Sequence, residues 1–261
     1  MFDYHMHTLV SFDGKETPED MLRAAENAGL KEICFTDHYD HDPRAKEQTM
    51  FFQMEDYAKA YDGLESKKLK IRRGVEFGML PDRPELLGQL LSRRSFDFVI
   101  GSVHFVDGWD VYFPPYWEGK TMEQAERRYL EEILACVRTH DDFDVLGHLT
   151  YISKAWNNPT NRPVAYEPYA DVVDEIFREL VRKEKGIEVN TSGMGCCGVY
   201  LPDVRYLQRF HELGGKIVTV GSDAHTPDRV GENTAHAARM VADIFGYVCT
   251  FENRSPIFHK I

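Results

Sequence analysis

The sequence predicts an α/β fold in which short parallel strands alternate with helices. Short apolar runs, several of them rich in β-branched residues, alternate along the chain with segments of helical periodicity. No linker, repeat or low-complexity block interrupts this alternation, so we expect one domain over residues 1–261. The seven runs expected as strands are Met1–His7, Glu32–Thr36, Leu69–Phe77, Phe96–His104, Asp144–His148, Gly186–Asn190 and Lys216–Gly221.

Capping patterns mark where the helices between these strands begin. The clearest is Thr17-Pro-Glu-Asp20, which combines an N-cap threonine, a proline at the first helical position and a carboxylate at the third. Apolar residues then recur on one face until Gly29, a typical residue to end a helix. We expect further helices to begin near Thr121, Pro168, Pro202 and Asp228.

Seven strand and helix units can close into a barrel related to the (β/α)₈ type or wind into an open, doubly wound sheet. An open sheet of this kind commonly binds a nucleotide through a glycine-rich loop that follows a strand. Neither GxGxxG nor GxxxxGK[ST] follows any predicted strand. Their absence weakens a nucleotide-binding function, while both arrangements of the sheet remain open on this evidence.

The composition excludes several classes of partner. The chain has 31 Lys and Arg against 43 Asp and Glu, and the resulting net charge of −12 repels nucleic-acid backbones and anionic lipids. No run approaches the ~20 apolar residues of a membrane-spanning helix. We therefore expect no long nucleic acid and no membrane as partner, whereas a small anion in a locally positive pocket remains compatible with the composition. A chain of 261 residues folds without a structural metal, so a metal bound here serves function.

The N-terminal segment and the cysteines predict a cytoplasmic protein. Residues 1–14 lack the basic and apolar regions of a secretion signal. The five cysteines form no CxxC pair, which is typical of a reducing compartment. The adjacent Cys196 and Cys197 are expected to be two reduced thiols, with a redox-sensitive pair as the alternative.

Metal-ligand residue types stand at the ends of six of the seven predicted strands. His5 and His7 lie two residues apart on one strand, so both imidazoles point to the same side. In a barrel of parallel strands these ends meet on one face, and burying so many ionisable groups there requires cations. The other strand ends carry Asp37 and His38, Glu76, His104, His148, and Asp223 with His225.

Two neighbouring residues are expected to take other roles. Asp37 points to the opposite face of its strand from His38, so we expect it to hydrogen-bond an imidazole rather than to bind a metal. His41 follows in an acidic loop and is left outside the ligand set.

The order HxH, TDH, a lone Glu, SVH, GH and SDAH resembles the polymerase-and-histidinol-phosphatase family of metal-dependent phosphoesterases, and the likeness covers the whole chain. The segments Gly101–Asp110 and Glu188–Gly193 further resemble the histidinol-phosphatase branch of this family. The resemblance implies a distorted, TIM-like (β/α)₇ barrel with its metal site at the C-terminal ends of the strands.

The resemblance also implies a site of three divalent metals with nine protein ligands. Asp13 lies in the loop after HxH, where family members can carry His, and its alternative role is to form a turn with Gly14. Glu76 is expected to bridge the first two metals. The implied sets are His5, His7, Glu76 and Asp223 for the first metal, Glu76, His104 and His148 for the second, and Asp13, His38 and His225 for the third.

This donor set indicates the chemistry of phosphate ester hydrolysis. Imidazoles and carboxylates without a thiolate suit Zn, Fe or Mn equally. Three divalent ions exceed the charge of the three carboxylates, so a hydroxide bridging two metals and an anionic phosphate monoester would complete the balance. Glu76, Asp223 and His225 are the expected catalytic residues, with Asp223 or His225 as the candidate proton donor to the leaving alkoxide.

Substrate recognition is expected from the loops that follow the strands. In the family a basic residue after the GH motif contacts phosphate, and Lys154 is the first candidate here and Arg162 the second. An aromatic loop after His104, with Trp109, Tyr112, Phe113, Tyr116 and Trp117, could hold an imidazole-bearing substrate or pack onto the barrel. The histidinol-phosphatase branch tends to carry a basic residue shortly after the segment that corresponds to Asn190–Gly193. This chain departs from that pattern, because it reads Met194-Gly195-Cys196-Cys197 there.

The expected function is a phosphoric monoester hydrolase that converts L-histidinol phosphate to L-histidinol and phosphate in histidine biosynthesis. One alternative is a phosphoesterase of the same family that acts on a nucleotide or another small phosphate ester. A second alternative is a metal-binding scaffold without turnover. The oligomeric state is not indicated by the sequence.

Overall fold

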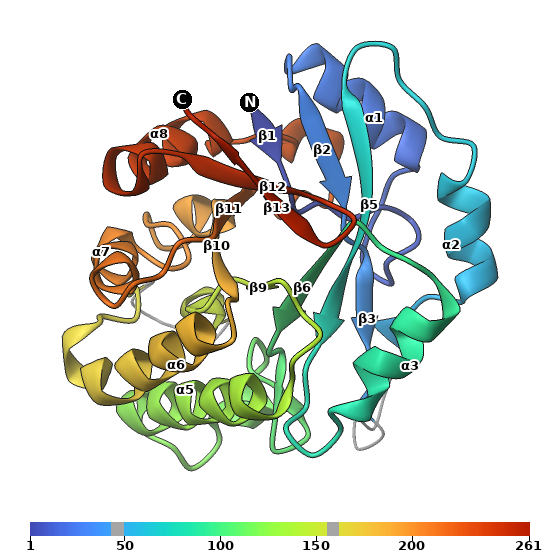
Figure 1. Cartoon of the computed structure of the whole chain (residues 1–261). Helices are drawn as coiled ribbons and strands as arrows, with labels where there is room; N and C mark the ends of the chain where they lie inside the picture. Colours follow the sequence, from blue (N-terminus) through green and yellow to red (C-terminus); the bar gives the residue numbers. More distant parts are fainter. Residues whose placement is uncertain (43–49, 156–161) are drawn as a thin grey trace.

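The computed structural model describes residues 1–42, 50–155 and 162–261. Seven parallel strands follow one another in the order β1-β2-β5-β6-β9-β10-β11 and are surrounded by helices (Figure 1). Each predicted strand is present, although several are shorter than expected. Their bounds are Phe2–Asp3 for β1, Glu32–Phe35 for β2, Lys70–Gly78 for β5, Phe98–Ser102 for β6, Val145–Leu146 for β9, Gly186–Asn190 for β10 and Val218–Gly221 for β11.

The first and last strands meet and close the barrel. Tyr4 N donates to Val220 O at 3.0 Å, and Met6 forms a parallel bridge with Ala224. A side chain at Gly221 would place its Cβ only 2.3 Å from His5 Cβ, so glycine allows this close approach. The predicted distorted (β/α)₇ barrel is confirmed, and the open, doubly wound sheet is excluded.

Short extra strands extend the loops at the C-terminal side of the barrel. β3 (His38–Asp40) follows β2 and pairs in parallel with β5, which places His38 opposite Glu76. β4 (Met50–Phe51) pairs antiparallel with β3, and β7 (Phe105–Val106) forms a hairpin with β8 (Trp109–Asp110). These strand pairings position the residues that follow β2 and β6.

The helices begin largely where the capping patterns predict. Thr17 caps α1 by accepting a hydrogen bond from Asp20 N, and Thr121 and Gln124 form a complete capping box on α5. The helix bounds are Pro18–Asn27 for α1, Met54–Tyr61 for α2, Glu85–Arg93 for α3, Pro114–Trp117 for α4, Met122–Thr139 for α5, Ala170–Arg182 for α6, Val204–Glu212 for α7 and Thr234–Phe245 for α8. Four 3₁₀ turns are η1 (Tyr151–Lys154), η2 (Glu167–Tyr169), η3 (Ser192–Gly195) and η4 (Pro227–Arg229).

The start of the last helix differs from the prediction. Asp228 lies in the η4 turn, and α8 begins only at Thr234, after Asn233 in the left-handed region with φ of 58°. The pattern Thr-Pro-Asp after the last barrel strand therefore starts a 3₁₀ turn and not the helix itself. No helix in the described ranges is long and apolar enough to cross a membrane.

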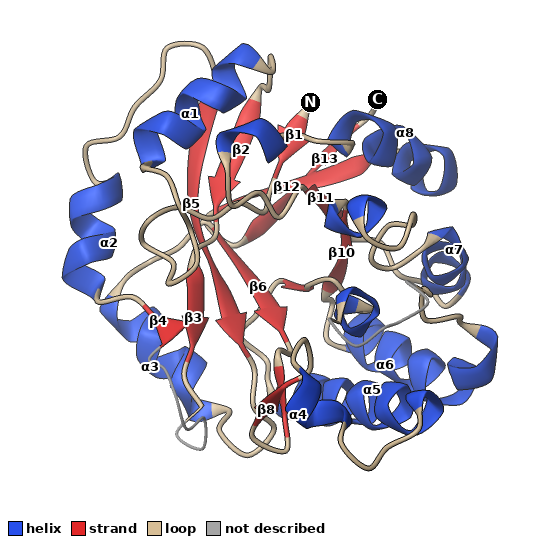
Figure 2. Cartoon of the chain, turned by 180° about the vertical axis from the view of Figure 1, so that it is seen from behind, coloured by secondary structure: helices blue, strands red, loops and turns tan. Residues whose placement is uncertain are grey.

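A C-terminal hairpin that the sequence pattern did not predict covers one end of the barrel. β12 (Val248–Glu252) and β13 (Ser255–His259) cross in front of the barrel strands in Figure 1 and behind them in Figure 2. Phe251 packs on Phe98 with ring centroids 4.8 Å apart, and Tyr4 Oη donates to Phe251 O at 3.1 Å. Because Phe98 begins β6, the hairpin covers the N-terminal ends of the strands, opposite the C-terminal ends.

We expect Phe251→Ala to lower the free energy of unfolding by about 3–5 kcal/mol, because its ring is 2% exposed and fills the end of the barrel. Phe258→Ala in the same hairpin is the matched control, since that ring is 50% exposed and should cost little. Urea titrations of both variants measure the difference. Equal losses would show that the hairpin does not pack on the barrel as described.

Candidate metal centre

The nine predicted metal ligands gather at the C-terminal ends of the barrel strands. They come from β3, β5 and the loops after β1, β6, β9 and β11, segments that are far apart in sequence. Most are buried, and His5, His7 and Glu76 are completely buried. The nine residues are His5, His7, Asp13, His38, Glu76, His104, His148, Asp223 and His225.

The first predicted set surrounds one small volume. His5 Nε2 lies 3.0 Å from His7 Nε2 and 3.1 Å from Glu76 Oε2. Asp223 Oδ1 lies 3.4 Å from His7 Nε2 and 3.7 Å from His5 Nε2. Asp223 reaches this place from the left-handed region, with φ of 58°, and its backbone N–H donates to His5 O at 2.8 Å.

Glu76 connects this set to the second one. Its other oxygen, Oε1, lies 2.8 Å from His148 Nε2 and 3.3 Å from His104 Nε2. The two imidazole nitrogens are 3.4 Å apart. A single buried carboxylate therefore faces imidazoles on both sides, as a bridging ligand must.

The third set is more open. Asp13 Oδ2 lies 3.2 Å from His225 Nε2 and 3.7 Å from His38 Nε2. The rings of His7 and His225 stack with centroids 4.2 Å apart, so this set adjoins the first one. Asp13 is 36% exposed at its side chain, and its Oδ1 is buried without a hydrogen-bond partner in the described structure.

The Nδ1 atoms of five of the six imidazoles have polar partners, which leaves Nε2 facing the centre. Glu188 Oε1 lies 2.6 Å from His5 Nδ1, and Asp40 Oδ1 lies 2.7 Å from His104 Nδ1. A carboxylate on Nδ1 fixes the ring orientation and makes Nε2 the metal-binding atom. The other partners are Ser11 Oγ for His7, Asp40 Oδ2 for His38 and the Asp223 carbonyl oxygen for His225.

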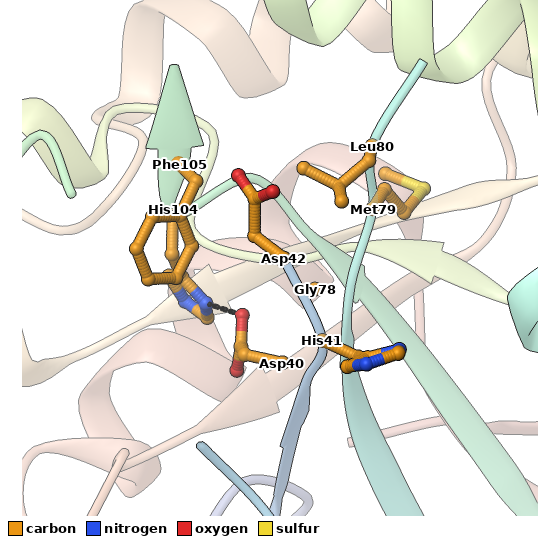
Figure 3. Close-up of a pocket in the computed structure, with 8 residues that line it drawn as sticks. All are labelled: Asp40, His41, Asp42, Gly78, Met79, Leu80, His104 and Phe105. Atoms are coloured by element: carbon orange, nitrogen blue, oxygen red, sulfur yellow. Dashed lines mark hydrogen bonds and ion pairs between the residues drawn. The ribbon is translucent and has the colours of Figure 1, made fainter. Parts of the chain in front are cut away.

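Sequence reasoning missed Asp40 and Glu188 as partners of the ligands. Asp40 lies two residues after His38 on β3, so the period of two was a usable signal. Figure 3 shows the Asp40 carboxylate directed at His104, while the ring of His41 points away from both. Glu188 stands on β10, the one predicted strand without an assigned ligand.

The expected contact between Asp37 and an imidazole is indirect. Asp37 Oδ1 accepts hydrogen bonds from Thr8 N at 2.7 Å and from Ser11 Oγ at 2.9 Å. Ser11 Oγ in turn lies 3.1 Å from His7 Nδ1. The hydroxyl of Ser11 therefore lies between the Asp37 carboxylate and the His7 ring. Asp37 also accepts a hydrogen bond from the backbone of Thr8 and so orients the loop after HxH.

An orphaned polar atom shows that these residues fit cations. Glu76 Oε2 faces the centre of the site and is buried without a hydrogen-bond partner in the part of the chain that the structure describes. The paired Nε2 atoms of His5 and His7 face each other, an arrangement that a shared cation stabilises better than a proton. The donor set of imidazoles and carboxylates matches a divalent transition metal.

The charges of the site lead to the same conclusion. Burial alone would raise the pKa of Glu76 and of Asp223, but nearby His5 and, for Asp223, Lys154 hold both well below the usual range. Burial would lower the pKa of His5, yet Glu188, Glu76 and Asp223 raise it well above normal. The buried carboxylates therefore demand positive charge, which metals supply as they displace ring protons.

A cavity of about 400 Å³ opens beside the ligands Asp223 and His225. Lys154 lines it, and its Nζ donates to Asp223 Oδ2 and Ser192 Oγ, both at 3.0 Å. Arg162 does not line this cavity, and its guanidinium pairs with Glu126 at 3.1 Å. Lys154 therefore contacts a predicted metal ligand, Asp223, whereas Arg162 pairs with Glu126.

The aromatic loop divides between the two expected roles. Tyr112 lines the cavity and stacks on Tyr151, whose centroid is 6.5 Å away. Tyr116 Oη donates to Ala125 O at 2.6 Å, and Trp117 Nε1 donates to Val111 O at 2.9 Å. Tyr112 is therefore placed to meet a substrate, whereas the latter two fasten the loop.

The five cysteines are free thiols. Cys196 lines the cavity, and its Sγ lies 3.7 Å from that of Cys197.

The chain is similar to known proteins along its whole length. The family model of the PHP domain matches residues 3–192. A probable histidinol-phosphatase of Clostridium acetobutylicum is 32% identical over 260 residues, covering 100% of this chain and 97% of that protein. The histidinol-phosphatase of Lactococcus lactis is 31% identical, covering 87% of this chain and 85% of that protein.

A solved structure is also similar over nearly its whole length. It is the histidinol phosphate phosphatase of Lactococcus lactis in complex with Zn, L-histidinol and phosphate. The TM-score is 0.86 at 29% sequence identity, with 98% of each chain covered.

We expect Glu188→Gln to weaken zinc binding by about 10–100-fold, because the amide no longer fixes the His5 ring as the carboxylate does. Equilibrium dialysis followed by metal analysis measures this change. Glu184→Gln, in the exposed turn just before the same strand, is the matched control. Unchanged zinc affinity in Glu188→Gln would contradict the assigned role of Glu188.

Proposed function

Since the chain belongs to the PHP domain family, we propose that it is a metal-dependent phosphoric monoester hydrolase that converts L-histidinol phosphate to L-histidinol and phosphate. The observation that carries this proposal is the convergence of nine imidazole and carboxylate ligands beside a cavity that Lys154 lines. The complex of the Lactococcus lactis enzyme with L-histidinol and phosphate supports this substrate.

The nine ligands would hold three divalent ions in the sets that the sequence predicts, with Glu76 shared by two of them. Zinc is the metal of the Lactococcus lactis complex, and the donor set here accepts it. Ions at these positions supply Lewis-acid activation of water and of the phosphoryl oxygens near neutral pH.

The protein's own groups bind the substrate and manage protons. Lys154 lies beside Asp223 and projects into the cavity, where its ammonium group can bind a phosphate oxygen. Asp40 and Glu188 hold His104 and His5 in orientation. Of the two predicted proton donors that border the cavity, His225 is the better placed to hand a proton to the leaving oxygen, because Lys154 and His5 hold the pKa of Asp223 well below its usual range and keep it ionised.

The cavity also offers a place for the imidazole of histidinol. Tyr112 presents an aromatic face there, and Tyr151 packs behind it. Stacking of an imidazole on such a face is favourable and needs no charge. A phosphate group near Lys154 and a ring near Tyr112 would occupy the two walls of one cavity.

Two further features support the setting of this activity. The five free thiols support a cytoplasmic enzyme. The net charge of −12 favours a small phosphate ester over a long nucleic acid.

Gly195 gives one reason to keep a second substrate class in view. It lies in the segment Met194–Cys197, shortly after Asn190–Gly193, where the histidinol-phosphatase branch tends to carry a basic residue close by, and it also lines the cavity. A nucleotide or sugar phosphate is therefore the competing substrate, with the metal chemistry unchanged.

The test of the substrate is kcat/KM for phosphate release from L-histidinol phosphate, beside nucleotides and sugar phosphates, on zinc- or manganese-loaded protein. We expect about 10⁴ M⁻¹s⁻¹ or more for L-histidinol phosphate and far lower values for the others. Faster release from another phosphate ester would keep the phosphatase activity and assign it a different substrate.

Glu76→Gln tests whether the site is catalytic or a scaffold. We expect the variant to fold and to lose more than about 100-fold in kcat/KM, because one buried charge that faces two ligand sets is removed. Glu175→Gln, a half-exposed carboxylate on α6, should keep full activity. Equal activity of Glu76→Gln and the wild-type protein would favour the scaffold.

A further inference from the structure

The cavity beside the metal ligands is locally positive although the chain as a whole is acidic. Lys15, Lys154 and Arg229 line it, and Asp223 is the one carboxylate of its described lining. Asp223 is already paired with Lys154 at 3.0 Å. Glu232 pairs with Arg229 from outside the lining, so three cationic side chains face two carboxylates and the remaining positive charge attracts an anion.

Arg229 occupies the space that a side chain at position 195 would enter. A Cβ added at Gly195 would lie 3.2 Å from Arg229 Nη2 and 3.7 Å from Nη1. Gly195 ends the η3 turn after β10, whereas Arg229 ends the η4 turn after β11. The loops after β10 and β11 thus meet at one position of the cavity wall. The loop after β11 supplies the Arg229 side chain there, whereas the loop after β10 has a glycine.

The guanidinium of Arg229 pairs with a glutamate three residues further along the chain. Its Nε lies 2.7 Å from Glu232 Oε2. Glu232 is tied to the end of β10, because Thr191 Oγ1 donates to its carbonyl oxygen at 2.6 Å. With Nε directed at Glu232, the two terminal nitrogens flank Gly195 at the cavity wall.

We propose that Arg229 binds the phosphate group of the substrate, together with Lys154. This inference rests on the proposed phosphatase function. The two terminal nitrogens of an arginine match two oxygens of one phosphate, which a lysine cannot do. The glycine at position 195 leaves room for this guanidinium, since a Cβ there would lie 3.2 Å from Arg229 Nη2 and crowd it.

The first test measures inorganic phosphate, which avoids any assumption about the rest of the substrate. Arg229→Gln removes the charge and keeps most of the length of the side chain. We expect its Kd for phosphate, measured by calorimetry on zinc-loaded protein, and its KM for the ester to rise about 10–100-fold, with kcat changing less. Arg239→Gln, exposed on α8, is the matched control and should leave both values unchanged.

The second test separates phosphate binding from a structural role in the loop. Arg229→Ala alone should bind phosphate as weakly as Arg229→Gln. The double variant Gly195→Arg, Arg229→Ala returns a guanidinium to the same wall from the other loop, and we expect phosphate affinity within about fivefold of wild type. An arginine that only stabilises the loop would not be replaced in this way.

The outcomes are distinct. An unchanged phosphate Kd in Arg229→Gln, at equal zinc content, overturns the inference. Loss of affinity that the double variant fails to recover, with a lowered melting temperature, also overturns it and makes Arg229 a structural residue. If wild-type protein binds phosphate through Arg229 but does not cleave L-histidinol phosphate, the proposed substrate fails and this inference stands.

Discussion

The buried carboxylate of Glu76 is the constraint on which the rest of the site depends. It lies near the C-terminal end of β5, completely buried, with His5 and His38 on one oxygen and His104 and His148 on the other. An isolated charge in such a place costs several kcal/mol, so the surrounding groups must compensate it. Imidazoles that exchange protons for divalent ions would provide that compensation, and the barrel brings these imidazoles together from separate strands.

The partners of the imidazoles make this arrangement selective for metal. Asp40 contacts the Nδ1 atoms of two ligands, and Glu188 contacts a third. Each contact leaves Nε2 directed inward, so the rings do not need to reorient when an ion binds. The same ions would offset the free-energy cost of burying Asp40 and Glu188. These two carboxylates are therefore expected to influence metal affinity although they do not face the metals.

One end of the barrel is packed and contributes to stability, and the other end carries the candidate site. The β12–β13 hairpin covers the N-terminal ends, where Phe251 packs on Phe98. The C-terminal ends keep a cavity whose wall carries Lys154 and Arg229, so an acidic protein presents a positive site to a phosphate ester. Net charge alone does not report this local positive charge, because it averages over surfaces that never meet the substrate.

The sequence by itself determined the features that local patterns encode. Apolar runs placed all seven barrel strands, capping residues such as Thr17 and Thr121 placed helix starts, and the alternation of a strand put His5 and His7 on one side. The family resemblance had already grouped the nine predicted metal ligands, but only the tertiary structure decided which other distant residues meet. It paired Arg162 with Glu126 and Lys154 with Asp223, and it set Arg229 beside Gly195. Such pairings depend on how the barrel closes and how its loops turn, and no periodicity within one segment records the distance to another.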